Sequence, residues 1–312
     1  MKAVQISSYG GVDVLEVNEN VPKPSFSEGQ VLVEVYGASI NPFDWKVREG
    51  YVKEYIQLQF PATLGGDFSG VIVDLGEGVS DFAIGDKIYG QAPVFGEGSG
   101  AFAEILAASV DKITKKPNKA DFLEAAALPL VGVSALQALE THIKLKGEQK
   151  ILIHGGAGGI GHIAIQLAKA IEAYVATTVS NDDKDFVKGL GADEIVDYKT
   201  QAFEEILSDF DAVFDTVGGD TTDKSFKVLK KGGVIVSMVG APNAELAQKY
   251  GVSIIGQNTE GNTERLKRLS ELVDSRKIKV HIDKVFPLEN AKEAFEHLEK
   301  NHPRGKIVLK IK

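Results

Sequence analysis

The sequence predicts an α/β protein in which a doubly wound parallel sheet is inserted into a β-rich domain. Up to about residue 110, short strand-like runs are separated by glycines. From residue 150 onward, strand-like and helix-like segments alternate, which is typical of βαβ units and a parallel sheet. A short tail follows the alternating part, so we expect both chain ends to build the β-rich domain.

The β-rich part contains three strand candidates, at residues 30–36, 71–73 and 102–106, each rich in apolar and β-branched residues. Near residue 121 the pattern changes. Asp121 followed by Glu124 forms a capping-box pattern at the start of an alanine-rich helix, and Pro129 separates that helix from a second one.

The alternating part predicts a series of short buried strands with helices between most of them. A closing strand follows two helices near the C-terminus. The expected strands are 150–154, 174–179, 195–197, 211–215, 233–238, 252–256 and 306–311, and the two late helices are 262–275 and 288–299.

Composition and charge exclude several classes of function. The formal net charge is −9 and no long basic stretch is present, which argues against nucleic acid or an anionic membrane surface as the main partner. The chain has no cysteine, so disulfides and thiolate metal ligands are impossible. We expect a cytoplasmic protein, because neither a signal peptide nor a membrane-spanning run is recognisable.

A glycine-rich loop at residues 155–161 lies between the strand 150–154 and an apolar-periodic helix. Gly156, Gly158 and Gly161 fit the G-x-G-x-x-G pattern in the strand-turn-helix setting that this pattern requires. Without Cβ atoms, the amides at the helix N-terminus can approach and bind a pyrophosphate. The alternative is a turn that only allows close packing; we favour dinucleotide binding because both flanking elements are present.

The position of the loop defines the expected domains. A single-domain short-chain reductase would carry the loop near its N-terminus and Tyr-x-x-x-Lys downstream, and none of the eight tyrosines has a lysine four residues later. We therefore expect a dinucleotide-binding domain at residues 121–261, inserted into a catalytic domain made of residues 1–120 and 262–312.

Short motifs at 41–46, 65–70, 85–90, 128–136 and 304–309, together with the glycine loop, resemble those of one protein family. In order and spacing they are similar to the zinc-independent medium-chain dehydrogenases/reductases, in the quinone oxidoreductase and enone (2-alkenal) reductase branch. The resemblance covers essentially the whole chain. It implies a GroES-like catalytic domain around a Rossmann-type sheet, and a homodimer joined near residues 252–256.

The resemblance also implies that no metal ion takes part. Zinc-dependent relatives have a cysteine where this sequence reads Asn41-Pro42, and Gly-His-Glu where it reads Gly65-Gly66-Asp67. The six histidines form no H-x-x-x-H pair. A catalytic zinc needs three protein ligands, and these residue types do not supply them.

The activity that the resemblance implies is NADPH-dependent hydride transfer to a quinone or an α,β-unsaturated carbonyl. The product anion needs a donor, and Lys46 is the candidate, its alternative being a solvated surface lysine. Asn41 is expected to donate to a carbonyl, and Asp44 to orient Lys46 or, as we prefer, to cap the following turn. Tyr51 and Tyr55 are expected to line the substrate entrance, or only to pack.

The expected cofactor is NADPH, with NADH as the alternative. Thr178 is neutral where NAD-binding folds place an acid at the end of the second strand. Ser180, Lys184 and Tyr198 resemble the residues that hold the 2′-phosphate in NADPH-dependent relatives, and Arg304 would add a fork. The remaining expected cofactor contacts are Ala157, Gly159 and Ile160 in the loop, Ser134, Val217, Val239 and Gly240.

Two other functional classes stay open. One is a protein that binds NADPH as a sensor or a structural component without significant turnover. The other is a zinc alcohol dehydrogenase, against which the missing cysteine and histidine ligands argue.

Overall fold

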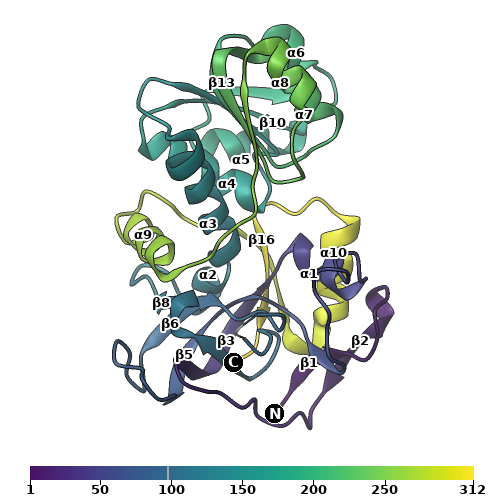
Figure 1. The fold of residues 1–312 in the computed structure, drawn as a ribbon, viewed down its shortest axis with the longest axis vertical. Helices are drawn as coiled ribbons and strands as arrows, with labels where there is room; N and C mark the ends of the chain where they lie inside the picture. The colour runs from purple at the N-terminus through teal and green to yellow at the C-terminus, as the bar shows by residue number, and fades with distance from the viewer. Residues whose placement is uncertain (97) are drawn as a thin grey trace. The chain divides into compact units, whose positions relative to one another are not determined.

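The structure is a computed structural model that describes residues 1–96 and 98–312. The described residues divide into two compact units. Unit 1 comprises Met1–Leu130, Gly261–Arg276 and Val280–Lys312, and unit 2 comprises Val131–Glu260 and Lys277–Lys279. Both chain termini therefore belong to unit 1 (Figure 1).

Unit 1 is rich in β-structure. Its strands are β1 (Ala3–Ile6), β2 (Leu15–Asn18), β3 (Gln30–Ile40), β4 (Ala62–Thr63), β5 (Asp67–Leu75), β6 (Lys87–Gln91), β7 (Ile105–Ser109), β8 (Ile113–Lys115), β15 (Ile282–Pro287) and β16 (Lys306–Lys310). Its helices are α1 (Pro42–Arg48), α2 (Phe122–Ala126), α9 (Thr263–Asp274) and α10 (Ala291–Lys300), with 3-10 turns η1 (Val12–Val14), η2 (Val110–Lys112) and η6 (Leu288–Asn290).

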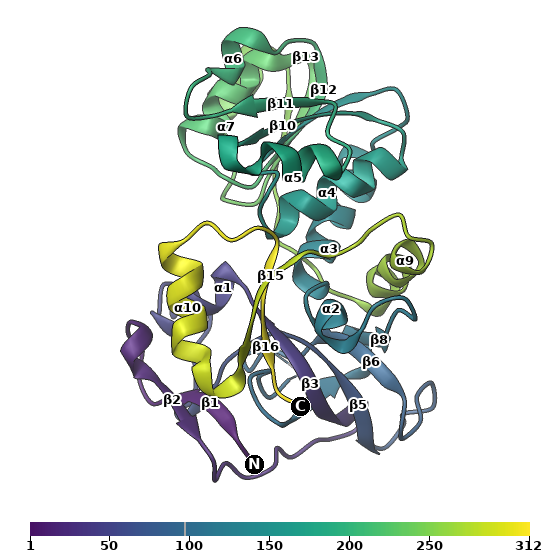
Figure 2. The same cartoon turned by 180° about the vertical axis from the view of Figure 1, so that it is seen from behind.

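The main sheet of unit 1 joins the two ends of the chain. Its described strands run in the order β15-β16-β3-β5-β6-β8, with β7 also paired to β3, and a smaller sheet has the order β2-β1-β4. β16 pairs antiparallel with β3, so that Ile307 lies opposite Ile40. Figure 2 shows the C-terminal helix α10 beside the N-terminal helix α1, and an ion pair of 2.8 Å joins Arg48 to Glu299.

One sequence expectation for unit 1 was wrong, and the first segment of unit 1 extends further than the expected catalytic domain. The strand expected at 102–106 is β7, three residues later, because Phe102 is fully buried and its backbone amide donates to Leu64. The domain boundary expected at 120/121 precedes helix α2, which belongs to unit 1. The Phe122 ring stacks on Tyr36 of β3 at 4.3 Å, and the Phe122 carbonyl accepts a hydrogen bond from Ser69.

Unit 2 contains the alternating elements. Its strands are β9 (Lys150–His154), β10 (Tyr174–Val179), β11 (Glu194–Asp197), β12 (Phe210–Asp215), β13 (Leu229–Ser237) and β14 (Ser253–Gly256). Its helices are α3 (Pro129–Leu136), which begins at the end of unit 1, α4 (Gly159–Ala170), α5 (Lys184–Gly189), α6 (Phe203–Ile206), α7 (Asp220–Ser225) and α8 (Ala244–Tyr250), with a π-helical turn η3 (Gln137–Ile143) and 3-10 turns η4 (Asn181–Asp183) and η5 (Phe226–Val228).

The sheet of unit 2 is doubly wound, as the sequence predicts. Its six described strands are all parallel and have the order β11-β10-β9-β12-β13-β14. Counted along the chain this is 3-2-1-4-5-6, the order in which ligands bind at the reversal beyond the carboxyl ends. Here the reversal lies between β9 and β12.

The expected strands of unit 2 are confirmed within one or two residues, except that β13 begins four residues early. It includes Gly232, whose φ of +84° accompanies a register irregularity against β12.

The capping box at Asp121 and Glu124 is also confirmed, and a new helix begins at Pro129. No helix of the described ranges is long and apolar enough to cross a membrane.

His154, the last residue of β9, is buried inside unit 2. Its Nδ1 lies 3.0 Å from the Thr178 hydroxyl and its Nε2 lies 2.9 Å from the Ser225 hydroxyl. Because Ser225 itself donates to the Thr221 carbonyl, Nε2 carries the proton and Nδ1 accepts from Thr178. Burial lowers the pKa of His154 to about 4, so the imidazole is neutral in the folded protein.

This neutral histidine makes stability depend on pH. Its folded pKa lies below the unfolded value, so the unfolded state binds more protons and stability is lost as pH falls from about 6.5 towards about 4. We expect His154 to account for about 2 kcal/mol of the loss between about pH 7 and pH 5. Urea unfolding of wild type and His154→Gln at both pH values measures the free energy of unfolding. An equal loss of this free energy in the two proteins would show that His154 does not cause the pH dependence.

Candidate active site

The glycine loop follows β9 and ends in helix α4. Gly155 has a φ of +73°, and Gly158 is the N-cap of α4. A Cβ on Gly156 would lie 2.1 Å from the Thr177 hydroxyl, and one on Gly161 would lie 2.2 Å from the Gly155 carbonyl. Neither position accepts a side chain, so packing alone requires these two glycines. The amides of the first turn of α4, which include Gly159, lack partners within the helix.

The loops after β12 and β13 lie beside the glycine loop. A Cβ on Gly155 would meet the Val217 side chain at 3.3 Å, and one on Gly218 would meet Val239 at 2.9 Å. Val217 and Val239 are about half exposed, at 52% and 50%. Val217 therefore lies beside the glycine loop, and Val239 lies beside the loop that carries Val217, so that a flat ring could pack on the two apolar side chains. Gly240, with a φ of +111°, continues the second loop.

The buried carboxylate of Asp215 organises the loop after β12. It accepts hydrogen bonds from the amides of Val217 and Gly218, at 2.8 and 3.1 Å, and from the Thr222 hydroxyl. Sequence reasoning did not single out this residue. The Asp-x-Val-Gly pattern at the end of a predicted strand is the signal that could have found it, because short acidic side chains commonly accept from amides two residues on.

Ser134 and Gln257 are in contact, and Gln257 directly follows the carboxyl end of strand β14 in unit 2. The Ser134 hydroxyl is 2.7 Å from the Thr259 hydroxyl, and the Gln257 side-chain amide donates to the Ser134 carbonyl at 3.0 Å. The Gln257 side-chain oxygen is buried and has no hydrogen-bond partner. An orphaned buried acceptor of this kind costs free energy unless a ligand supplies a donor. Gln257 was not predicted from the sequence.

Three of the residues expected around a 2′-phosphate lie together. Ser180 follows β10, Tyr198 follows β11, and these neighbouring strands pair up to Val179 and Asp197. The Ser180 hydroxyl donates to Asp183 at 2.8 Å, and Tyr198 is 54% exposed. The Lys184 ammonium is 4.0 Å from the Asp197 carboxylate, so a phosphate there would compete with that carboxylate.

Two other expected cofactor residues are placed differently. Thr178 is buried, and its hydroxyl is engaged by His154 and by the Gly155 amide, which donates to it at 3.4 Å. Its side chain thus supports the glycine loop. Arg304 belongs to unit 1, where its backbone amide donates to Asp283.

In unit 1, Asn41 lies between β3 and helix α1, and the rest of the segment 41–46 is the first part of α1. The Asp44 carboxylate accepts a hydrogen bond from the Asn41 backbone amide at 2.7 Å, the capping arrangement that the sequence favours. The Asn41 side chain is buried and is held at both ends. Its nitrogen donates to Asp67 at 2.9 Å, and its oxygen accepts from the Lys306 ammonium at 2.5 Å.

Asp67 is the centre of this buried polar cluster, which consists of Asn41, Asp44, Asp67, Gln91 and Lys306. One Asp67 oxygen accepts from Asn41, from the Leu130 amide at 3.1 Å and from the Ser39 hydroxyl at 3.4 Å, and the other accepts from Gln91 at 2.9 Å.

Burial changes the titration of all three charged groups in the cluster. It raises the pKa of Asp67, although Lys306 and the hydrogen-bond donors oppose this. It raises the pKa of Asp44 to about 7, with the Asn41 amide and Lys306 opposing and Asp67 adding to the effect. It lowers the pKa of Lys306 to about 8 against the attraction of Asp67 and Asp44. Burial thus disfavours the charged form of each group, and the hydrogen bonds and opposite charges within the cluster oppose that effect.

This donor set does not fit a zinc ion. The Asp67 oxygens are occupied by protein donors, the Asn41 oxygen is bound to an ammonium group, and Gly66 offers no ligand. Residues 1–96 and 98–312 also contain no group of three acidic, histidine or cysteine side chains that could hold a metal.

Lys46 lies on α1 among aromatic side chains. It is half-buried, with its ammonium 5.8 Å from the centre of the Trp45 ring, and Trp45 packs edge-on against Tyr51 at 5.6 Å. Tyr51 and Tyr55 are 71% and 89% exposed. Tyr51 thus has a packing partner, as the alternative interpretation expects, while still presenting an apolar face to solvent.

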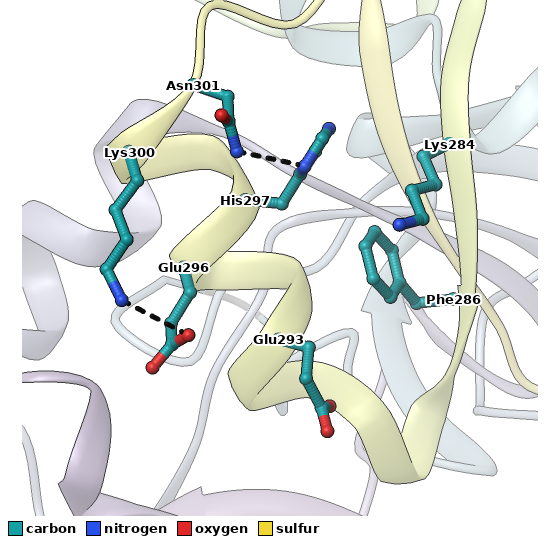
Figure 3. Close-up of a pocket in the computed structure, with 7 residues that line it drawn as sticks. All are labelled: Lys284, Phe286, Glu293, Glu296, His297, Lys300 and Asn301. Atoms are coloured by element: carbon teal, nitrogen blue, oxygen red, sulfur yellow. Dashed lines mark hydrogen bonds and ion pairs between the residues drawn. The ribbon is translucent and has the colours of Figure 1, made fainter.

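A separate surface hollow lies between β15 and α10 in unit 1 (Figure 3). It is lined by charges of both signs, and two of these, Lys300 and Glu296, form an ion pair of 3.2 Å with each other. It contains none of the residues predicted from the sequence, and its charges largely neutralise one another. The seven lining residues are Lys284, Phe286, Glu293, Glu296, His297, Lys300 and Asn301.

Comparison with known proteins gives two family matches. Residues 27–118 match the family model described as "Alcohol dehydrogenase GroES-like domain", and residues 190–309 match the one described as "Zinc-binding dehydrogenase". The chain is 36% identical to the NADPH-dependent alkenal/one oxidoreductase of Arabidopsis thaliana, a chloroplastic protein, over 99% of this chain and 79% of that one.

Two solved structures share the fold over the full chain. The quinone oxidoreductase of Coxiella burnetii has a TM-score of 0.92 and 39% identity, covering 100% of this chain and 99% of that one. The Escherichia coli quinone oxidoreductase, solved in complex with NADPH, has a TM-score of 0.89 and 27% identity, with complete coverage of both chains. The chain therefore belongs to the medium-chain dehydrogenase/reductase family, in the branch of quinone oxidoreductases and alkenal/one reductases.

Proposed function

We propose that this chain catalyses the NADPH-dependent reduction of a quinone or an α,β-unsaturated carbonyl compound without a metal ion. The observation that carries the proposal is the glycine loop at the reversal of the doubly wound sheet, which fits the pyrophosphate of a dinucleotide. The Arabidopsis and E. coli relatives, whose descriptions name NADPH, support the choice of cofactor.

The residues of unit 2 fit a nicotinamide dinucleotide. Gly156 packs tightly against β10 and Gly161 against the loop itself, so the amides of Ala157, Gly159, Ile160 and Gly161 can approach a pyrophosphate at the positive end of the α4 dipole. The Gly158 amide closes the loop by donating to the Gly155 carbonyl at 3.0 Å, and Gly158 contributes the absence of a side chain. Val217 and Val239 offer an apolar face to a ring. The orphaned oxygen of Gln257, beside Ser134, offers an acceptor for a carboxamide N–H. When bound, reduced nicotinamide supplies the hydride.

The 2′-phosphate of NADPH would be held by Ser180, Lys184 and Tyr198. Lys184 supplies the positive charge, and Tyr198 and Ser180 supply hydroxyl donors from the ends of neighbouring strands. The residue at the end of β10 that would repel a phosphate in an NAD-specific protein is here the neutral Thr178. We include Arg304 as a further proposed phosphate contact.

Lys46 is the proposed catalytic residue. Hydride addition to the β-carbon of an enone leaves an enolate, and addition to a quinone leaves a hydroquinone anion. An ammonium group held next to the developing oxyanion stabilises it more than it stabilises the neutral substrate, which lowers the barrier. Asn41 and Asp44 fix the first turn of α1, next to Lys46. Tyr51 and Tyr55 contact the apolar part of the substrate. Water supplies the final proton.

The oxyanion therefore needs no metal in this proposal. The polar cluster around Asp67 supports a metal-free mechanism, because the positive charge in this cluster is the ammonium group of Lys306, which already binds protein oxygens. The family description "Zinc-binding dehydrogenase" belongs to the matched family and not to a ligand set in this chain.

We also propose a homodimer and a cytosolic location. β14 is an edge strand of its sheet, so its outer N–H and C=O groups are open to pairing with another strand. A second copy of β14 would continue the sheet across a two-fold axis. The Arabidopsis relative, by contrast, is described as chloroplastic.

The proposed function predicts turnover with a defined set of acceptors. Purified protein should oxidise NADPH, and oxidise NADH much less efficiently, in the presence of quinones, 2-alkenals or cyclic enones. Steady-state absorbance at the nicotinamide band measures this across the panel. Tight NADPH binding without turnover of any acceptor would instead favour a sensor or structural protein.

Removing the ammonium of Lys46 should slow the chemical step. We expect Lys46→Ala to lower kcat by about 10- to 1000-fold, as for other deletions of a transition-state donor. Lys53→Ala, an exposed lysine in the segment that follows α1, is the matched control and should turn over like wild type. Equal kcat values for wild type and Lys46→Ala would remove Lys46 from the mechanism.

Removing the charge of Lys184 should affect one cofactor only. We expect Lys184→Ala to raise the KM for NADPH by about tenfold and leave that for NADH nearly unchanged, because only NADPH carries the phosphate. Lys188→Ala, exposed on the same helix, is the control. A similar rise for both cofactors would show that Lys184 does not recognise the phosphate.

A further inference from the structure

The buried ammonium of Lys306 binds the junction between β3 and α1. It donates to the carbonyl of Ile40, the last residue of β3, at 2.7 Å, and to the side-chain oxygen of Asn41 at 2.5 Å. Asn41 is the N-cap of α1. Lys306 is itself the first residue of β16, whose pairing with β3 fixes its backbone. The ammonium therefore holds the chain where the strand ends and the helix begins.

Asp67 fixes the other end of the Asn41 side chain. The Asn41 side-chain nitrogen donates to Asp67 at 2.9 Å while its oxygen accepts from Lys306. A planar amide bound on both sides in this way has one allowed orientation. Two hydrogen bonds thus hold the Asn41 side chain to Asp67 and Lys306, and a third, from the Asn41 backbone amide to Asp44 at 2.7 Å, joins Asn41 to the first turn of α1.

The far end of α1 has an independent anchor. Arg48 is fully buried and donates to the Gly10 carbonyl at 3.1 Å, to Glu299 at 2.8 Å and to Glu49 at 2.5 Å. Loss of the Lys306 contact therefore leaves the C-terminal end of the helix in place. The loss is therefore expected to displace the first turn of α1, which ends at Trp45, and Lys46 directly after it.

We propose that Lys306 is a positioning residue, which sets the place of Lys46 by holding the Ile40–Asn41 junction through a buried ammonium group. Its kinetic consequence rests on the proposed function, whereas its structural consequence does not. Lys306 touches neither substrate nor cofactor in this proposal. It acts through Asn41 and the first turn of α1.

Trp45 gives a direct readout of the position of α1, because it is the only tryptophan in the chain. The experiment compares wild type, Lys306→Met and the matched control Lys310→Met, which removes an exposed lysine from the same strand. Acrylamide quenching of Trp45 fluorescence is measured on each protein. We expect the quenching constant to rise in Lys306→Met and to stay at the wild-type value in Lys310→Met.

The same three proteins are then assayed with NADPH and a quinone or enone. We expect kcat to fall by about 10- to 100-fold in Lys306→Met, since a displacement of about 1 Å at a reacting group has effects of this size. The KM for NADPH should stay within about twofold, because Ser180, Lys184 and Tyr198 lie in unit 2, which is unchanged, and the exposed side chain of Arg304 is not part of the buried cluster. Unchanged kcat, or a lower kcat with wild-type Trp45 quenching, overturns the proposal.

If Lys306→Met does not fold, the physical reason is that the buried charge of Asp67 has lost the positive charge of Lys306. The double variant Lys306→Met/Asp67→Asn removes both charges. Its new amide oxygen can still accept from Asn41, and its new amide nitrogen can face Gln91, whose amide can turn to present its oxygen. Raised Trp45 quenching in this variant supports the proposal, and wild-type quenching overturns it. If wild type shows no turnover, the proposed function fails while the quenching comparison still decides this inference.

Discussion

The ammonium group of Lys306 lies inside unit 1, where burying an unpaired charge would cost several kcal/mol. That cost is offset only because the group meets a carbonyl, an amide oxygen and two nearby carboxyl groups in one place. Each partner of Lys306 must in turn be held in place by its own hydrogen bonds. Asp67 must collect four donors, and Asn41 must keep one orientation. The first turn of α1 is thereby fixed, and with it the lysine that the proposed reaction needs.

Unit 2 builds its part of the site by a different physical device. There the backbone makes the binding surface, since the glycine loop leaves no room for side chains at Gly156 and Gly161. Side chains act from behind it. His154 and Thr178 hold the strand ends beneath the loop, and Asp215 holds the neighbouring loop by its amides. The backbone provides amide donors for an anion, and the buried polar side chains keep those donors in position.

The sequence predicted unit 2 more accurately than unit 1, for a physical reason. Central strands of a parallel sheet are covered on both faces and read as continuous apolar runs, which local patterns reveal. The antiparallel pairing of β3 with β5 in unit 1 contains two register shifts, and burial of Phe102 outside a strand produced the wrong prediction at 102–106. The position of α2 was likewise invisible locally, because it depends on stacking of Phe122 on Tyr36.

By itself, the sequence determined the doubly wound sheet, the glycine loop, the cap at Asp44 and the lack of cysteine ligands, because each follows from residues close together in the chain. Only the tertiary structure decided that Lys306 meets Asn41, from which it is separated by 265 positions. Antiparallel pairing of β16 with β3 makes this contact, and it forms only when the two chain ends fold together. Local patterns carry no information about such a pair, so a lysine and an asparagine that each resemble surface residues become the buried support of the candidate site.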